Sequence, residues 1–227
     1  MTEAYTPGPV GHAVAAALLD AGCVTARTDE PFRLPSGWAS PVYIDCRRLI
    51  AFPALRRDLV SRGLRLLRER GALDGVTLVA GGEASGIALA AWVAEALDLP
   101  LAYVRKKQVG QSRVVGVVKP GDKVLMVDDM MAAGQSKAAF CKALTAAGAV
   151  VQDLFVVFDY AAFPSHQILD PLGLHVHALA TWKDVLAVAR ERGGLDTQAL
   201  KELAEFLDDP GAWSQAHGGI AAYRLDK

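Results

Sequence analysis

The sequence predicts an α/β fold in which helices cover a central parallel sheet. From Val76 onward, short runs rich in β-branched residues alternate with stretches of helical pattern, which is typical of such folds. The predicted strands, among them VTLVA, KVLMV and LFVVF, are apolar at nearly every position, as expected when both faces of a sheet are buried. With 227 residues, of which 52% are hydrophobic, the chain is long enough to build one such core.

Two helices are predicted ahead of the sheet. Pro9–Ala21 has an apolar helical pattern, and Pro53–Arg70 is amphipathic, with arginines between its apolar positions. The sheet region is then predicted as strand Val76–Ala80, helix Gly86–Leu97, strand Leu101–Arg105, strand Lys123–Val127, helix Ser136–Ala147 and strand Val150–Val157. Leu174–Leu179 can add one further strand.

Two helices are predicted at the C-terminal end. Thr181 and Asp184 have the spacing of a capping box, and Asp196 can cap the second helix. That helix is expected to stop at Asp209-Pro210-Gly211. No internal repeat or flexible linker suggests a second large domain.

Composition excludes several classes of protein. With 24 Lys plus Arg against 25 Asp plus Glu, the net charge is -1, so the chain has no overall attraction for nucleic acid or anionic membranes. Apolar stretches such as Ile87–Leu97 are shorter than the ~20 residues of a membrane span, and the start MTEAYTPGPV does not resemble a signal peptide. Cys23, Cys46 and Cys141 are widely spaced, which favours reduced thiols and a cytoplasmic location.

The sharpest local feature is VLMVDDMMAAGQSK, a buried strand that ends in Asp128 and Asp129 and passes through small residues into a helix. Two carboxylates can hold vicinal hydroxyls or a hydrated Mg²⁺, and the amides of a helix start can receive a phosphate. Open α/β sheets usually bind ligands at this edge. We expect both carboxylates to be exposed there and to contribute little to folding. The alternative is that they only end the strand and cap a turn.

Two further segments could complete an anion site. AGGEASG is again a strand followed by a glycine-rich turn and a helix, although a Gly-Gly turn alone is weak support. Arg105, Lys106 and Lys107 follow another strand and precede Gln108–Pro120, which is predicted as a long loop or flexible arm. Cations beside two anion-receptive loops favour a polyphosphate ligand, the alternative being a solvated basic edge.

Aromatic and hydroxyl side chains mix in PFRLPSGWASPVYIDCR, ahead of the sheet. Phe32, Trp38 and Tyr43 can cover a planar ligand while Ser36 and Ser40 donate hydrogen bonds; equally, these residues can pack over the sheet edge.

Two other features favour structural roles. His175 and His177 alternate in a strand and lack further ligands at metal-binding spacing. Cys141 lies in a predicted helix and fits a core position better than a nucleophile.

Four segments resemble, in their order and spacing, the orotate phosphoribosyltransferase family in its bacterial form with a C-terminal helical extension. They are PFRLPSGWASPVYIDCRRLI, VAGGEASGIALAAWVAEALDLPLAYVRKK, VLMVDDMMAAGQSK and AWSQAHGG. The resemblance runs from the first helix to the end of the chain. It implies a type I phosphoribosyltransferase-like parallel sheet flanked by helices, with an N-terminal hood and a C-terminal helical tail. One domain, 1–227, would comprise helices and hood (1–72), α/β core (73–180) and extension (181–227).

The resemblance also implies an activity, the Mg²⁺-dependent transfer of phosphoribosyl from phosphoribosyl pyrophosphate to orotate. The products are orotidine 5'-monophosphate and pyrophosphate, in pyrimidine nucleotide biosynthesis. Mg²⁺ would be held mainly by substrate and water, with Asp128 nearby. The family resemblance further implies a homodimer, in which Arg105 and Lys106 reach the neighbouring subunit's site.

Individual roles follow by position. Asp128 and Asp129 match the pair that holds the ribose hydroxyls. The catalytic set is completed by Arg105, Lys106 and Arg113, and the residues that match substrate-binding segments are Ser36, Gly37, Tyr43, Gly82, Glu83, Ala84, Lys107, Ala132, Ala133, Gly134, Gln135 and Ser136.

The sequence departs from the family at two places. The loop Met131–Ser136 lacks the usual threonine, and Val109 lies where a lid lysine is expected, with Gln111 near the usual histidine or aromatic residue of a slightly shorter lid. Loss of one contact to the departing pyrophosphate can cost on the order of a hundredfold in rate. Two alternatives therefore stay open: a divergent phosphoribosyltransferase acting on another base, and a non-catalytic paralogue or partner subunit that binds nucleotide or phosphoribosyl pyrophosphate.

Overall fold

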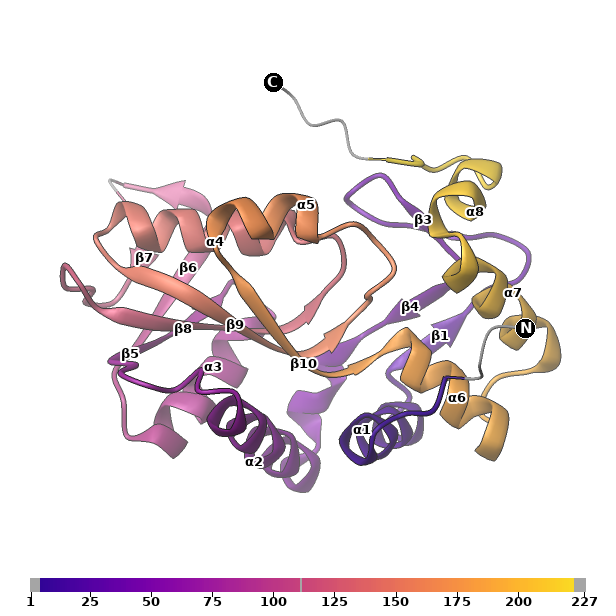
Figure 1. Cartoon of the computed structure of the whole chain (residues 1–227), viewed down its shortest axis with the longest axis horizontal. Helices are drawn as coiled ribbons and strands as arrows, with labels where there is room; N and C mark the ends of the chain where they lie inside the picture. Colours follow the sequence, from indigo (N-terminus) through magenta and orange to yellow (C-terminus); the bar gives the residue numbers. More distant parts are fainter. Residues whose placement is uncertain (1–4, 111, 223–227) are drawn as a thin grey trace. The chain divides into compact units, whose positions relative to one another are not determined.

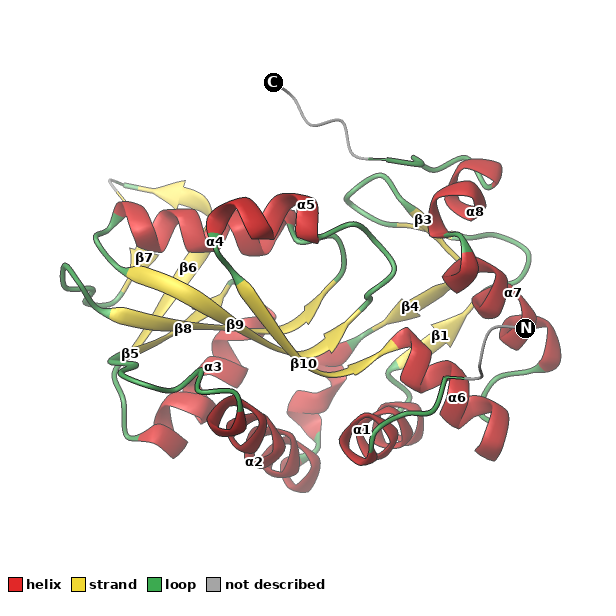
Figure 2. Ribbon diagram, viewed as in Figure 1, coloured by secondary structure: helices red, strands yellow, loops and turns green. Residues whose placement is uncertain are grey.

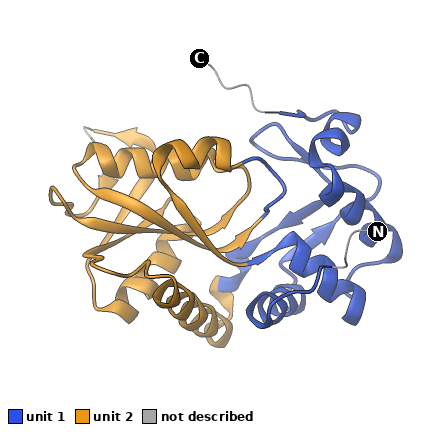
Figure 3. Cartoon of the chain, in the orientation of Figure 1, with its two compact units in different colours: residues 1–49, 160–164, 180–227 blue, residues 50–159, 165–179 orange. Residues whose placement is uncertain are grey.

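The computed structural model describes residues 5–110 and 112–222. Gln111, one of the two lid positions singled out above, lies outside the described residues. The chain divides into two compact units, shown in Figure 3. Unit 1 takes the N-terminal region to residue 49 together with 160–164 and the C-terminal region from 180, and unit 2 takes 50–159 and 165–179.

Unit 2 is built on a six-stranded sheet with the order β10-β9-β8-β5-β6-β7 (Figure 2). Its strands are β5 (Leu78–Gly82), β6 (Leu101–Val109), β7 (Ser112–Val115), β8 (Lys123–Met131), β9 (Val150–Asp159) and β10 (His175–Thr181). The neighbours β9, β8, β5 and β6 run parallel, and β7 pairs antiparallel with β6. The predicted parallel sheet is therefore confirmed.

Helices cover both faces of this sheet. In Figure 1, α4 (Gln135–Ala146) and α5 (His166–Leu169) lie on one face, and α2 (Pro53–Glu69) and α3 (Ser85–Leu97) lie on the other. Met126, Phe140 and Leu144 are among the buried residues that fill the core beneath α4. On the opposite face α2 approaches β9 closely because residue 63 is glycine: a Cβ there would lie 2.3 Å from Cζ of Phe155.

The predicted elements of unit 2 are found, with shifted ends. The strand expected at Val76–Ala80 begins two residues later, because the preceding residues form a turn in which the Val76 N–H donates to Leu73 O. The prediction of a loop over Gln108–Pro120 is wrong in its first half. There β6 continues to Val109, the chain turns at Gly110 with φ +69°, and β7 pairs back onto β6.

Unit 1 combines short strands and helices from both ends of the chain. Its elements are α1 (Pro9–Asp20), β1 (Val24–Ala26) paired with β4 (Val42–Ile44), β2 (Phe32–Arg33) paired with β3 (Ala39–Ser40), α6 (Trp182–Arg192), α7 (Thr197–Asp208) and α8 (Pro210–Ala216). Of the two 3-10 helices, η1 (Cys46–Ala51) begins in unit 1 and ends in unit 2, and η2 (Asp170–Leu172) belongs to unit 2.

The capping predictions hold, but one C-terminal helix was missed. Thr181 and Asp184 form the capping box of α6, and the Asp196 carboxylate accepts the Ala199 N–H at 2.8 Å. The second predicted helix, α7, ends at Asp208 as expected, but a further helix follows it. The Asp209 carboxylate accepts the Ala212 N–H at 2.9 Å and so begins α8.

An aromatic cluster fills the interior of unit 1. Trp38 is 2% exposed and its ring lies 4.7 Å from Phe163, and Tyr160 packs edge-on to Trp182 at 5.3 Å. For Trp38 the packing interpretation is therefore correct, and ligand covering is not. In the part of the chain that the structure describes, no helix is both long enough and apolar enough to cross a membrane.

Candidate functional site

The strand order of unit 2 creates a switch point between β5 and β8. After β5 the chain crosses through α3 to β6 on one side, and after β8 it crosses through α4 to β9 on the other. Crevices in open α/β sheets form at the carboxyl ends of strands where the order reverses in this way. The sheet therefore brings together the Gly82–Ala84 turn, which follows β5, and the acidic pair in the last part of β8.

Both carboxylates of the acidic pair are buried, which corrects the expectation that they are exposed. Asp128 is 4% exposed and Asp129 is 9% exposed. Asp128 Oδ1 accepts the Asp129 N–H at 2.9 Å, and Asp128 Oδ2 pairs with the ammonium of Lys137. The exposure on which the prediction of a small contribution to folding rested is therefore wrong, and for Asp128 we now expect a substantial contribution, because breaking a buried ion pair leaves an uncompensated charge.

Asp129 is held differently from Asp128. Its Oδ1 accepts the N–H of Met130 at 2.9 Å, and the Ser85 hydroxyl hydrogen-bonds to the same carboxylate. Burial raises the pKa of Asp129 to about 7, and the neighbouring Asp128 charge adds to that rise, while the Lys137 charge and the Ser85 hydrogen bond oppose it. Asp129 is therefore a buried acid that titrates near neutral pH.

The turn after β5 connects to the basic end of β6. The Glu83 N–H donates to Val104 O at 2.9 Å, and the Glu83 carboxylate accepts the Lys106 N–H at 2.6 Å. The peptide bond between Glu83 and Ala84 is cis. Two of the predicted segments, the glycine turn and the basic run, are thus hydrogen-bonded neighbours.

The basic run begins the β6/β7 hairpin. Arg105 is half-buried, and Lys106 and Lys107 are exposed. The Arg113 guanidinium donates through Nε to Arg105 O at 2.9 Å and lies 5.9 Å from the Phe140 ring, so Arg113 braces the base of the hairpin.

The loop predicted to receive phosphate leads into α4 as expected. Ala132 is half-buried, Ala133 and Gly134 are buried, and Gln135 and Ser136 are exposed in the first turn of the helix. Gly134 takes φ +90° at the N-cap, where no side chain caps the helix. The first N–H groups of a helix have no partner within it, so this end of α4 can accept an anion.

The residues predicted to cover a base belong to unit 1 and are described within it. Ser36 and Gly37 lie in the β2/β3 turn, where Gly37 takes φ +91°, and the half-buried Tyr43 ring lies 5.4 Å from Phe32. The Ser36 Oγ is buried and has no hydrogen-bond partner among the described residues. Ser40 does not fit a ligand-binding role, because its buried hydroxyl donates to Val42 O at 2.8 Å.

Two residues near the acidic pair were not predicted. Ser85 contacts Asp129, and Lys137 is only 8% exposed although lysines are usually solvated. Their one signal in the sequence is position, since each lies in the first turn of a helix that follows a predicted ligand loop.

The other polar clusters are structural. His177 Nε2 lies 2.8 Å from Asp153 Oδ1, which confirms a structural role for that histidine, and Cys141 is buried in the core as expected. The described residues contain no group of three or more His, Cys, Asp or Glu side chains that could hold a metal ion.

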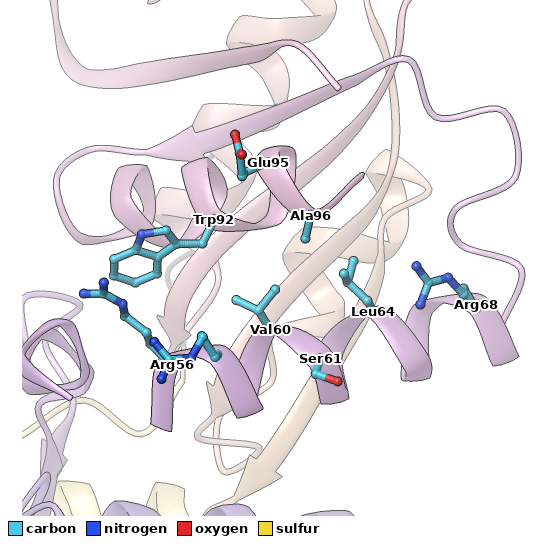
Figure 4. A pocket seen from close by; sticks show the side chains of 9 residues that line it. Arg56, Val60, Ser61, Leu64, Arg68, Trp92, Glu95 and Ala96 are labelled. Atoms are coloured by element: carbon cyan, nitrogen blue, oxygen red, sulfur yellow. The ribbon is translucent and has the colours of Figure 1, made fainter. Parts of the chain in front are cut away.

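A groove of about 430 Å³ lies between α2 and α3 (Figure 4) and contains none of the predicted site residues. Val60, Leu64 and Ala96 form its apolar lining, and the Arg56 guanidinium lies 4.5 Å from the centre of the Trp92 ring. It is lined by helices on one face of the sheet, whereas the predicted acidic pair and basic run lie within β8 and β6 and the glycine turn lies at the end of β5.

No protein-family model matches the chain. Curated relatives match it over most of its length. The orotate phosphoribosyltransferase of Sinorhizobium medicae is 42% identical over 227 residues, which cover 97% of each chain. The orotate phosphoribosyltransferase of Dinoroseobacter shibae is 43% identical over 205 residues, which cover 88% of this chain and 90% of the other. The chain belongs to the orotate phosphoribosyltransferase family.

Solved structures agree with this family assignment. The orotate phosphoribosyltransferase of Aeropyrum pernix is 32% identical with a TM-score of 0.65, covering 77% of this chain and 97% of its own. Leishmania donovani UMP synthase has a TM-score of 0.76 at 27% identity, and this chain, 88% covered, spans 42% of that longer protein. An adenine phosphoribosyltransferase from Rhodothermus marinus, 22% identical with a TM-score of 0.57, shares the fold. The predicted type I phosphoribosyltransferase fold is confirmed.

Proposed function

We propose that this orotate phosphoribosyltransferase family member transfers the phosphoribosyl group of phosphoribosyl pyrophosphate to orotate, giving orotidine 5'-monophosphate and pyrophosphate. The observation that carries this proposal is the near full-length similarity to curated relatives named for that activity. The geometry of unit 2 supports it, because the glycine turn at the end of β5, the basic run in the second half of β6 and the acidic pair in the last part of β8 lie on strands that pair in parallel.

In this proposal the end of β8 and the start of α4 hold the phosphoribosyl part. The acidic pair, Asp128 and Asp129, lies where the ribose hydroxyls bind. Backbone amides from Ala132 to Ser136 receive the 5'-phosphate, since a helix start carries partial positive charge. The missing threonine at Ala132 removes one hydroxyl donor, while Ser136 remains exposed and able to donate.

The pyrophosphate is assigned to the glycine turn and the basic run. Gly82, Glu83 and Ala84 offer their backbone, and Arg105, Lys106 and Lys107 supply positive charge. As the anomeric bond loosens, negative charge grows on the departing pyrophosphate, and cations that engage it more strongly at that moment speed the step. Mg²⁺ would supply further positive charge there. Since the described residues build no metal cluster of their own, the ion would be held by pyrophosphate and water.

Base recognition is assigned to the hood segment of unit 1. On the family resemblance, Ser36, Gly37 and Tyr43 contact orotate. The unsatisfied Ser36 hydroxyl supports this, because a buried hydroxyl without a partner costs free energy that a ligand hydrogen bond can recover.

We also propose that the protein is a cytoplasmic homodimer. The three cysteines are buried free thiols, which suits a reducing compartment. The dimer rests on the family resemblance, in which the basic residues after β6 act in the neighbouring subunit's site.

The deciding experiment measures pyrophosphate release from phosphoribosyl pyrophosphate and Mg²⁺ with orotate, with adenine, and with no base. Release that requires orotate, together with formation of orotidine 5'-monophosphate, is the expected result. Release with another base but not orotate would support a divergent acceptor instead. Binding of phosphoribosyl pyrophosphate without release for any base would support a non-catalytic paralogue.

A further inference from the structure

Three side chains of unit 1, those of Arg27, Phe32 and Tyr43, form a stack. The guanidinium carbon Cζ of Arg27 lies 4.4 Å from the centre of the Phe32 ring, and that centre lies 5.4 Å from the centre of the Tyr43 ring, with the two rings tilted by 32°. A guanidinium group over an aromatic face is attracted by the partial negative charge of that face. Phe32 is therefore held between a cation and a second ring.

The backbone around this stack does not depend on the Arg27 side chain. The Arg27 N–H donates to Pro41 O at 2.8 Å, which continues the antiparallel pairing of β1 with β4. In β4 the buried side chains of Val42 and Ile44 face the core, and Tyr43 between them points to the other face. A substitution that removes only the guanidinium group therefore acts on the stack and leaves the strand pairing in place.

The two rings are not fixed by deep burial. Phe32 and Tyr43 are both half-buried, and Phe32 lies in a strand of only two residues. Contacts between side chains therefore contribute much of what orients these rings. The exposed Arg27 can supply such a contact, whereas the neighbouring Arg47 is engaged by Asp45, with Nε 2.5 Å from Oδ1.

We propose that Arg27 is a positioning residue for the base: by holding Phe32 against Tyr43, it fixes the orientation of the Tyr43 ring that contacts orotate. This inference rests on the proposed function, in which Tyr43 contacts orotate, and deepens it. Arg27 acts through Phe32 and does not itself touch the substrate. Because the stack belongs to unit 1 and phosphoribosyl pyrophosphate is assigned to unit 2, its effect should be confined to the base.

The test measures steady-state kinetics of variants at position 27, with Mg²⁺ and both substrates varied. Arg27→Ala should raise KM for orotate about threefold, the size expected for loss of one exposed cation–π contact, and leave kcat and KM for phosphoribosyl pyrophosphate unchanged. Arg27→Lys should keep KM for orotate within about 1.5-fold of the wild type, because an ammonium group can also lie over the Phe32 ring. Arg190→Ala, at an exposed arginine of α6 in the same unit, is the matched control and should change neither KM.

A double-mutant cycle with Phe32 separates positioning from direct contact with orotate. Phe32→Leu removes the ring through which Arg27 acts, so adding Arg27→Ala to Phe32→Leu should raise KM for orotate no further. A further threefold rise in the double variant would overturn the proposal, because the guanidinium group would then act on orotate itself. Thermal unfolding of each variant separates a change in KM from a loss of folding. If Phe32→Leu does not fold, the contrast between Arg27→Ala and Arg27→Lys still decides.

Two further results would overturn the proposal. One is an unchanged KM for orotate in Arg27→Ala, and the other is an equal rise in KM for both substrates, which would indicate a general loss of structure. With an active wild type, either result refutes this inference alone and leaves the proposed function intact. Wild-type protein that forms no orotidine 5'-monophosphate would refute the proposed function, and this inference with it.

Discussion

At Asp129, burial and a neighbouring negative charge work against ionisation. They raise the pKa of this carboxyl from 3.8 to about 7, so the folded protein keeps a proton over a pH range in which the unfolded chain has lost it. A state that binds more protons is favoured at lower pH. The contribution of Asp129 to stability is therefore fully present below about pH 4 and is lost as the pH rises through about 7.

The first prediction concerns this pH dependence. Replacing Asp129 with Asn removes the titrating group, so the stability of the variant relative to the wild type should increase from pH 5 to pH 8. The increase should be about 1–3 kcal/mol, because the wild type loses most of the remaining Asp129 contribution as the pH rises through about 7. Urea unfolding at the two pH values measures the difference. Asp208→Asn, at an exposed position in α7, is the control. An equal difference between Asp129→Asn and wild type at both pH values would contradict the raised pKa.

The acidic pair shows what a sequence can and cannot predict for single residues. Two carboxylates directly after an apolar strand could be located from pattern alone, because strand ends in such sheets face ligands. Their burial could not be predicted, since it depends on how Gly82, Gly86 and Lys137 converge from three different elements. Residue type gave no hint either, because lysines are almost never buried unless paired.

Among the elements, the β6/β7 hairpin differs most from its prediction. Residues 108–120 contain two glycines, a proline and several polar residues among their valines, which favours a loop, and Ser112–Val115 is too short to be recognised as a strand. Pairing with β6 supplies the hydrogen bonds that such a short strand lacks alone. In this hairpin Val109, the position at which the family resemblance leads us to expect a lid lysine, is 61% exposed.

The second prediction is that Val109→Lys raises kcat for orotate about tenfold and changes KM little. A valine cannot donate to the charge that develops on pyrophosphate, whereas a lysine engages it mainly in the transition state. Steady-state kinetics measure both constants. Val117→Lys introduces the same charge at a position 74% exposed and should have no effect.

Two results of that experiment would refute the idea that Val109 limits turnover. One is an equal rise in both lysine variants, which would indicate general electrostatic attraction. The other is brisk wild-type activity that Val109→Lys leaves unchanged and Arg113→Ala abolishes. Arg113 would then act on pyrophosphate, although in this structure its guanidinium holds the hairpin through Arg105 O.

At the scale of the whole chain, unit 1 joins the two ends of the sequence. The Ala39 N–H donates to Ser214 Oγ at 2.9 Å, the Ser214 hydroxyl donates to Ile220 O at 2.7 Å, and the Ile220 N–H donates to Gly37 O at 3.1 Å. Sequence pattern predicted α6 and α7 but not α8. It could not predict that the tail packs on the hood, because these contacts join residues about 175 positions apart.

The third prediction follows from this junction. Ser214→Ala leaves the buried Ala39 N–H and the partly buried Ile220 carbonyl without this partner, which should lower the free energy of unfolding by about 1–3 kcal/mol. Since the same contacts hold the turn that contains Ser36 and Gly37, KM for orotate should rise while KM for phosphoribosyl pyrophosphate changes little. Urea unfolding and steady-state kinetics measure these effects, with Ser61→Ala on the exposed surface of α2 as the control. A parallel rise in both KM values would show that the tail does not act on the base selectively.

The last prediction concerns assembly and uses two variants that the proposed site predicts to be inactive. Lys106→Ala removes an exposed side chain, and Asp129→Asn alters a buried one, so each change impairs a different part of the proposed site. If Lys106 acts in the neighbouring subunit's site, a mixed dimer carries both defects in one site and leaves the other intact. Random association of equal amounts should then restore about a quarter of the wild-type activity.

Sedimentation measures the dimer, and each variant incubated alone at the same total concentration is the control. If the activity of the mixture is no higher than the mean activity of the two variants alone, every site is completed within one subunit. Exchange of subunits could then never produce an intact site.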